Sequence, residues 1–105
     1  LLDGRPILSC LTLAVEADGR EITTLEGLEK DGELHPLQQA FLEEAAAQCG
    51  YCTSAMILTS LALLRENPSP SEEDIKRAIE ANLCRCGTYQ NVIKAVLKVS
   101  GKLRR

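Results

Sequence analysis

Four segments of the chain repeat apolar residues at the three- and four-residue steps of an α-helix. The first covers residues 36–47, with Pro36 at the position that a helix start favours and Gly50 beyond its end. The second, Thr53–Arg65, is apolar on nearly every side, and Pro68 follows its end. This pattern predicts two consecutive helices, of which the second is the more buried.

The third and fourth segments carry signals for helix starts. Ser71 precedes the third, 72–82, and Asp74 three residues later approximates a capping box. Thr88 precedes the fourth, which extends to the C-terminus, and threonine is a residue that caps helices. The apolar positions of the two segments are Ile75, Ala78, Ile79 and Leu83, followed by Val92, Ile93, Val96, Val99 and Leu103. Four helices in one short chain predict a mainly α fold arranged as a bundle.

The first 26 residues have a different pattern. Leu11–Val15 is a short apolar run that contains a threonine, and Ile22–Leu25 follows a turn at Asp18-Gly19. Two such runs around a turn predict a small pair of strands. Residues 27–35 lie in a stretch rich in glycine and charge, so we expect a surface linker there.

Composition narrows the class of protein. The 105 residues are 45% hydrophobic but only 3% aromatic, so leucine, isoleucine, valine and alanine must fill the core of one compact domain. The net charge is −3 and aromatic stacking platforms are absent, which argues against a nucleic-acid partner. The most apolar run, Ala55–Leu64, is too short for membrane insertion, and no segment has the pattern of a secretory signal. We therefore expect a cytoplasmic protein.

Cysteines carry the chemical signal. Five cysteines without a secretory signal indicate metal or redox chemistry rather than a disulfide scaffold. Cys49 and Cys52 fall between the first two predicted helices, and Cys84 and Cys86 fall between the last two. If both turns lie at one end of the bundle, four thiolates meet there and the positive ends of two helices face them. The pattern predicts one metal centre.

The spacing alone leaves the metal open. Structural zinc accepts four cysteines, but it usually takes two C-x2-C pairs, whereas Cys84 and Cys86 have one residue between them. A thioredoxin-like dithiol would explain Cys49 and Cys52 only, and it needs a βαβ context that is absent from the pattern. Buried inert thiols are a further explanation, but cores draw such cysteines from helix faces rather than from two turns. A [2Fe-2S] cluster and zinc both remain.

Two motifs resemble a known family. Gln48-Cys-Gly-Tyr-Cys52 before an apolar helix, and Asn82-Leu-Cys-Arg-Cys-Gly-Thr-Tyr89, closely resemble the helical [2Fe-2S] domain in the small iron–sulfur subunit of xanthine dehydrogenase-type molybdenum hydroxylases. The resemblance implies one [2Fe-2S] cluster on the four cysteines of these motifs, in a four-helix domain over residues 36–105. It also implies electron transfer from a molybdenum-pterin centre on a large partner subunit towards a second cluster or FAD on another subunit. The chain would then be an electron-transfer subunit of an oxidoreductase, with no catalytic residues of its own.

The same resemblance assigns roles outside the four cysteines. Asp3–Ala14 is similar to the end of the plant-type ferredoxin domain that comes first in this family, so residues 1–26 would be a short β remnant of it. Cys10 would then be an orphan ligand, expected to be a free thiol because one thiolate does not hold a cluster. Gln48 lies where the family contacts the pterin, although its residue type and position alone indicate an exposed amide at a helix end.

Two alternatives belong to other functional classes. One is a zinc-stabilised four-cysteine module for protein interaction, without redox function. The other is a nonfunctional truncated fragment, because a missing ferredoxin segment would interrupt the relay. Colour and metal content distinguish the first from an iron–sulfur protein, and association with a large subunit distinguishes the second.

Overall fold

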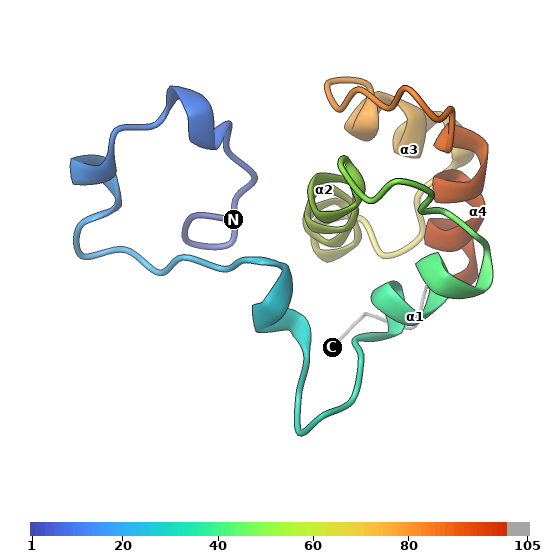
Figure 1. Ribbon diagram of the computed structural model, residues 1–105, viewed down its shortest axis with the longest axis horizontal. Coiled ribbons are helices and arrows are strands. Elements are labelled where there is room, and N and C mark those ends of the chain that lie inside the picture. The colour runs from blue at the N-terminus through green and yellow to red at the C-terminus, as the bar shows by residue number, and fades with distance from the viewer. Residues whose placement is uncertain (101–105) are drawn as a thin grey trace.

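The computed structural model describes residues 1–100, in which a group of four α-helices lies beside an irregular N-terminal segment (Figure 1). This confirms the mainly α class predicted from the sequence. The α-helices are α1 (Pro36–Glu43), α2 (Thr53–Glu66), α3 (Glu72–Ile79) and α4 (Tyr89–Val99). Three short 3₁₀ helices precede them: η1 (Ser9–Leu11), η2 (Ala14–Ala17) and η3 (Leu25–Leu28).

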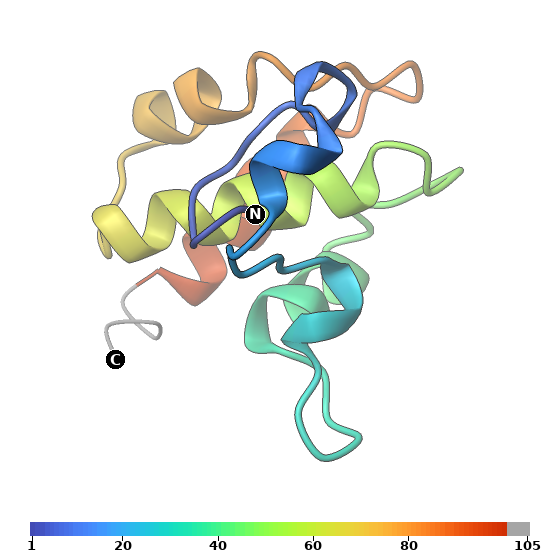
Figure 2. The same cartoon turned by 90° about the vertical axis from the view of Figure 1, so that its left-hand side faces the viewer.

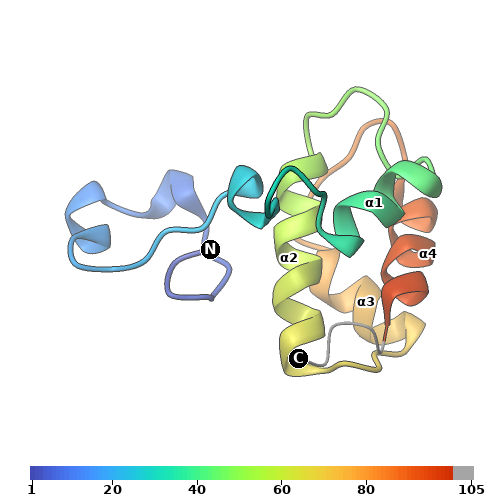
Figure 3. The ribbon, with the colours of Figure 1, turned by 90° about the horizontal axis from the view of Figure 1, so that it is seen from below.

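The core lies between the four α-helices. α2 packs against α1, α3 and η3, while α4 packs against α1 and α3 (Figure 3). Aliphatic side chains fill most of this core, as the low aromatic content predicts, and they surround the single buried ring of Phe41. Leu28 of η3 is also buried in this core, although it lies within the predicted surface linker.

Local capping explains where α1 and α3 begin. The side chain of His35 accepts a hydrogen bond from the backbone N–H of Leu37, and the side chain of Gln38 accepts one from the N–H of His35. At α3, Ser71 and Asp74 form the reciprocal pair predicted from the sequence, with bonds of 3.2 Å and 3.0 Å. Each pair satisfies two backbone donors that a helix start otherwise leaves open.

α1 ends four residues earlier than predicted, at Glu43 rather than near residue 47. Ala45 adopts a left-handed φ of 52°, and the N–H of Ala46 bonds to the carbonyl of Phe41 at 2.9 Å. This 6→1 bond is the mark of a Schellman ending, which normally uses glycine at the left-handed position. The alanine gives no such signal in the sequence, so Gly50 was mistaken for the end of the pattern.

The predicted end of α3 at residue 82 is also too late, since the helix ends at Ile79. The chain turns immediately after it, with the N–H of Asn82 bonded to the carbonyl of Ile79 at 2.9 Å. The side-chain amide of Asn82 then donates to the hydroxyl of Thr59 on α2 at 3.1 Å. The loop between α3 and α4 is thereby fastened to α2.

The predicted strand pair at Leu11–Val15 and Ile22–Leu25 is wrong. Within residues 1–100, β pairing is limited to the isolated bridges Leu2–Arg5, Leu2–Ile22 and Lys30–Glu33. The turn at Asp18-Gly19 does form, but 3₁₀ helices occupy part of both runs, and most of their apolar side chains are exposed. A two-stranded pair without a covering layer is marginal, which explains why the alternating pattern did not produce strands here.

α4 carries the apolar stripe that was predicted. Val92, Ile93, Val96 and Val99 are all buried, whereas Leu103, the last predicted stripe position, lies outside the described residues. Across residues 1–100, every helix is too short or too polar to cross a lipid bilayer.

Candidate metal centre

The two cysteine-bearing loops lie at the same end of the helical group. Residues 44–52 form the α1–α2 loop and residues 80–88 form the α3–α4 loop, and both project beyond that end (Figures 2 and 3). α2 starts at Thr53 directly after the first loop, and α4 starts at Tyr89 directly after the second. The topology therefore brings two helix N-termini and two cysteine pairs to one place.

The hydrogen bonds between thiols run from one loop to the other. The Cys52 thiol hydrogen-bonds Cys84, and the Cys86 thiol hydrogen-bonds Cys49. Each loop thus contributes one sulfur to each pair. Among residues 1–100, no three cysteine, histidine or carboxylate side chains surround a single position for a metal ion. Two pairs match the needs of two irons that take two thiolates each, whereas one zinc ion takes four ligands at about 2.3 Å.

Cys84 has the strongest support for a negative charge. Its Sγ lies 3.2 Å from the hydroxyl oxygen of Thr88, and its backbone N–H donates to the hydroxyl of Tyr89 at 2.7 Å. Hydrogen bonds from the side chain and then the backbone of Thr88 lower the pKa of Cys84 to about 6. Cys84 therefore forms the thiolate, which is the form that binds iron, more readily than an ordinary cysteine does.

The other affected thiols shift in the opposite direction. Burial, followed by the hydrogen bond and charge of Cys84, raises the pKa of Cys52. A backbone hydrogen bond from Cys49 lowers the pKa of Cys86, but the Cys49 thiol, burial and the charge of Cys84 together outweigh it and raise the value. Sulfurs this close repel one another as thiolates. A cationic metal removes this repulsion and allows all of its ligands to ionise.

The surroundings also suit a negatively charged cluster. Cys52 and Thr88 occupy the N-cap positions of α2 and α4, and neither side chain caps its helix, so backbone N–H groups at both starts remain available. The hydroxyl oxygen of Thr53 is buried beside Cys52 without a hydrogen-bond partner among the described residues. These donors fit a [2Fe-2S] cluster, whose thiolates and sulfides give it net negative charge.

Large side chains around the sulfurs divide into two groups. Tyr89 is half-buried and packs against the core, where it can exclude water from Cys84. Tyr51 is 94% exposed and Leu83 is 83% exposed, so neither shields the sulfurs in this chain. Cys49 and Arg85 are exposed as well.

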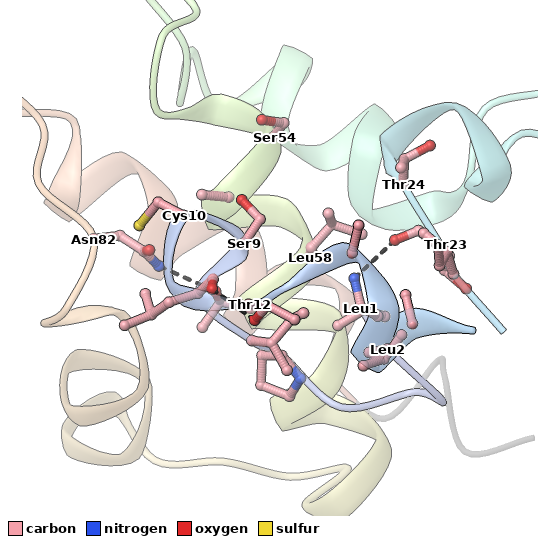
Figure 4. Close-up of a pocket in the computed structure, with 18 of the residues that line it drawn as sticks. Leu1, Leu2, Ser9, Cys10, Thr12, Thr23, Thr24, Ser54, Leu58 and Asn82 are labelled. Atoms are coloured by element: carbon pink, nitrogen blue, oxygen red, sulfur yellow. Dashed lines mark hydrogen bonds between the residues drawn. The ribbon is translucent and has the colours of Figure 1, made fainter. Parts of the chain in front are cut away.

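Three further candidates lie apart from the sulfur pairs. Gln48 is exposed in the α1–α2 loop, next to Cys49 but beyond the end of α1. His35 caps α1 and is not a ligand candidate. Cys10 lies exposed on η1, and it lines a cavity of about 490 Å³ between the N-terminal segment and α2 (Figure 4).

Thr88 has a role at the site that was not predicted from the sequence. The residue stands at the N-cap of α4, as predicted, but its hydroxyl contacts the Cys84 sulfur instead of capping the helix. The sequence offers one signal for this contact, the four-residue step from Cys84 to Thr88 through the tight Cys-x-Cys-Gly turn. The hydroxyl of Tyr89 and the Asn82 tie to α2 were missed in the same way.

Most of the chain matches a known protein family. Residues 24–97 match the family model described as a [2Fe-2S] binding domain. The chain is 48% identical over 103 residues to the nicotine 6-hydroxylase small subunit of Paenarthrobacter nicotinovorans, covering 98% of this chain and 62% of that protein. It is 47% identical over 100 residues to the xanthine dehydrogenase iron–sulfur-binding subunit of Escherichia coli, covering 92% of this chain and 62% of that protein.

Solved structures share the fold. The crystal structure of quinoline 2-oxidoreductase from Pseudomonas putida 86 superposes with a TM-score of 0.86 at 41% identity, over 100% of this chain and 68% of that one. The chain spans about three fifths of the length of the two curated relatives named above.

Proposed function

The chain belongs to the family of [2Fe-2S] binding domains, and from this premise we propose that it relays single electrons within a molybdenum hydroxylase. The resemblance of its cysteine motifs to small iron–sulfur subunits is confirmed by relatives such as the nicotine 6-hydroxylase small subunit and the iron–sulfur-binding subunit of xanthine dehydrogenase. One observation supports this proposal most directly: the cysteines that precede α2 and the cysteines that precede α4 lie together at the N-termini of these two helices.

We assign the four loop cysteines as the ligands of one cluster. Cys52 and Cys84 would hold one iron, and Cys49 and Cys86 the other, because these are the sulfurs that lie together. When bound, the cluster accepts and releases one electron. The chain would supply thiolates, backbone donors and partial exclusion of water, and bond chemistry on a substrate would take place on a partner subunit.

The relay requires partners on both sides. A molybdenum-pterin centre on a large subunit would deliver electrons, and a second cluster or an FAD-binding subunit would receive them. The exposed Tyr51 and Leu83 support this proposal, because aromatic and leucine side chains beside a redox centre offer a docking surface. Gln48, exposed next to Cys49, would contact the pterin. We expect the complex to work in the cytoplasm.

The N-terminal segment is proposed to belong to a neighbouring unit. Residues 1–26 would be the remnant of a ferredoxin-like domain, 27–35 a linker and 36–105 the cluster-binding domain. The exposed apolar side chains of this segment support that division, since they lack a covering layer in the described residues. Cys10 would then be the orphan ligand of a ferredoxin-type cluster and a free thiol in this chain.

Metal and sulfide analysis of the anaerobically purified chain tests the assignment. About two irons and two sulfides per chain, with red-brown absorption, are expected. One zinc and a colourless protein would establish the interaction module instead. The variant Cys52→Ser should lose the absorption, while the matched variant Cys10→Ser should keep it. Loss of the cluster in Cys10→Ser would contradict the assignment of ligands.

Association with a partner tests the relay itself. The chain should co-purify with a large molybdenum-binding subunit when the two are produced together. A chain that holds the cluster but binds no such subunit would agree with a nonfunctional fragment. The two experiments separate failure of the metal site from failure of the complex.

A further inference from the structure

Thr88 occupies a capping position without capping. It is the N-cap residue of α4, where a threonine hydroxyl commonly stabilises the helix start by accepting a backbone hydrogen bond. Here the hydroxyl oxygen instead lies 3.2 Å from the Cys84 sulfur, and it also hydrogen-bonds Cys52. The side chain is only 1% exposed. The hydroxyl is therefore committed to one sulfur pair rather than to the helix.

We propose that Thr88 is a positioning residue that raises the reduction potential of the cluster by donating its hydroxyl proton in a hydrogen bond to the Cys84 sulfur. This inference rests on the proposed function, in which Cys84 is an iron ligand. A ligand thiolate has no proton, so the hydroxyl must be the donor in that state. One hydroxyl has one proton, which serves either Cys84 or Cys52 at a given moment.

The direction of the effect follows from charge. Reduction adds one electron and one negative charge, part of which resides on the thiolate sulfurs. A hydrogen bond to a charged acceptor strengthens as the acceptor becomes more negative. The Thr88 hydroxyl therefore stabilises the reduced state more than the oxidised state. No proton is transferred in this step, because the hydroxyl keeps its proton throughout.

Burial and neighbouring donors set the size of the effect. Because Thr88 is buried, water does not readily replace its hydroxyl when that group is removed. The N–H of Cys84 is already engaged by Tyr89, so it does not compensate. The backbone groups of Thr88 and Cys86 also hydrogen-bond Cys84, and they remain in any side-chain variant. We therefore expect a shift of the potential rather than loss of the cluster.

The test is a redox titration of the intact cluster-loaded chain, followed by visible absorption with dithionite as reductant. Thr88→Val keeps the branched shape and removes the hydroxyl, and it should reduce the equilibrium constant for reduction about tenfold, a shift of 59 mV for one electron. Thr88→Ser restores a hydroxyl and should return the potential to the wild-type value. Thr24→Val is the matched control, because its hydroxyl bonds Glu26 in the N-terminal segment.

Equal potentials in the wild type and Thr88→Val would overturn the inference, as would a serine variant displaced as far as the valine variant. If the valine variant does not load, Thr88→Ala replaces it with the same expectation. Loss of the cluster in both apolar variants, but not in the serine variant, would assign the hydroxyl to assembly and also overturn the inference. A wild-type chain without any [2Fe-2S] spectrum would instead refute the proposed function.

Discussion

The side-chain amide of Asn82 donates a hydrogen bond of 3.1 Å to the hydroxyl of Thr59 and so ties the α3–α4 loop to α2. The same loop carries Cys84 and Cys86, while the Cys49–Cys52 pair directly precedes α2. The bond therefore connects the loop that carries one set of two cysteines to the helix that follows the other set. Neither Asn82 nor Thr59 is itself a proposed ligand.

Asn82→Ala should release the α3–α4 loop. A side-chain hydrogen bond contributes about 1 kcal/mol, so we expect a comparable loss in the free energy of unfolding and faster release of iron to a chelator. Guanidinium unfolding and the decay of visible absorption measure the two effects. Combining Asn82→Ala with Thr59→Val gives a double-mutant cycle, and strictly additive losses would show that the two residues are not coupled.

Ala45→Gly should stabilise the chain. Ala45 holds a left-handed φ of 52°, which costs an alanine roughly 1–2 kcal/mol and a glycine little. We expect the free energy of unfolding to rise by about 1 kcal/mol, reduced somewhat by the greater freedom of glycine in the unfolded chain. Ala47→Gly is the control, because Ala47 does not have a positive φ. Equal destabilisation by both changes would refute this account of how α1 ends.

Acid should weaken the start of α3. Hydrogen bonds from the backbone and then the side chain of Ser71 lower the pKa of Asp74, with help from the charge of Arg77 and the amide of Asn67. A lowered pKa means that the stabilisation is complete above the usual aspartate value of about 3.9. It is lost as the pH falls through the lower value of the folded state.

Unfolding of the wild type and of Asp74→Asn across this range checks the pH dependence. The wild type should be the more stable protein near pH 7, and the difference should shrink as the pH falls below about 3.9. Glu73→Gln alters an exposed neighbouring carboxylate that lies 3.7 Å from Lys76 and is the control. A wild-type advantage that stays constant down to the acid limit would contradict the capping assignment.

Tyr51→Ser and Leu83→Ser should weaken docking without changing the cluster. Both side chains are exposed beside the sulfurs, and tyrosine is among the residues that most often contribute more than about 1 kcal/mol to an interface, so the larger effect is expected for Tyr51→Ser. Co-purification with the large subunit should fall about tenfold or more, while the absorption spectrum stays the same. Leu42→Ser is the control, since Leu42 is an exposed leucine on α1. An unchanged yield of complex in both variants would place the interface elsewhere.

Local signals explain which parts of the fold were predictable. The starts of α1 and α3 depend on residues within one turn, such as Pro36 and the Ser71–Asp74 pair, and these starts were predicted correctly. The end of α1 depends on Ala45, whose left-handed conformation has no mark in its residue type. The N-terminal strands failed because strand pairing depends on covering partners that a local pattern does not contain.

The site, like the fold, has a part that local sequence signals predict and a part that they do not. The placement of the cysteines in two loops followed from where the helices begin and end, so the sequence predicted that the pairs could meet. Which sulfur faces which depends on the relative arrangement of two loops far apart in the chain, and only the structure gives the pairing of Cys52 with Cys84. The contact of the Thr88 hydroxyl with the Cys84 sulfur was also not predictable, because a threonine before a helix normally indicates a cap.

The crossed pairing of the sulfurs gives the inorganic core a mechanical role. If each iron binds one sulfur from each loop, the cluster is a cross-link that closes the chain between Cys49 and Cys86 into a ring. α2 and α3 lie inside that ring, so the cross-link would lower the conformational entropy of this part of the unfolded chain and stabilise both helices. Removing iron and sulfide should therefore lower the free energy of unfolding of this part of the chain as well as abolish its electron transfer.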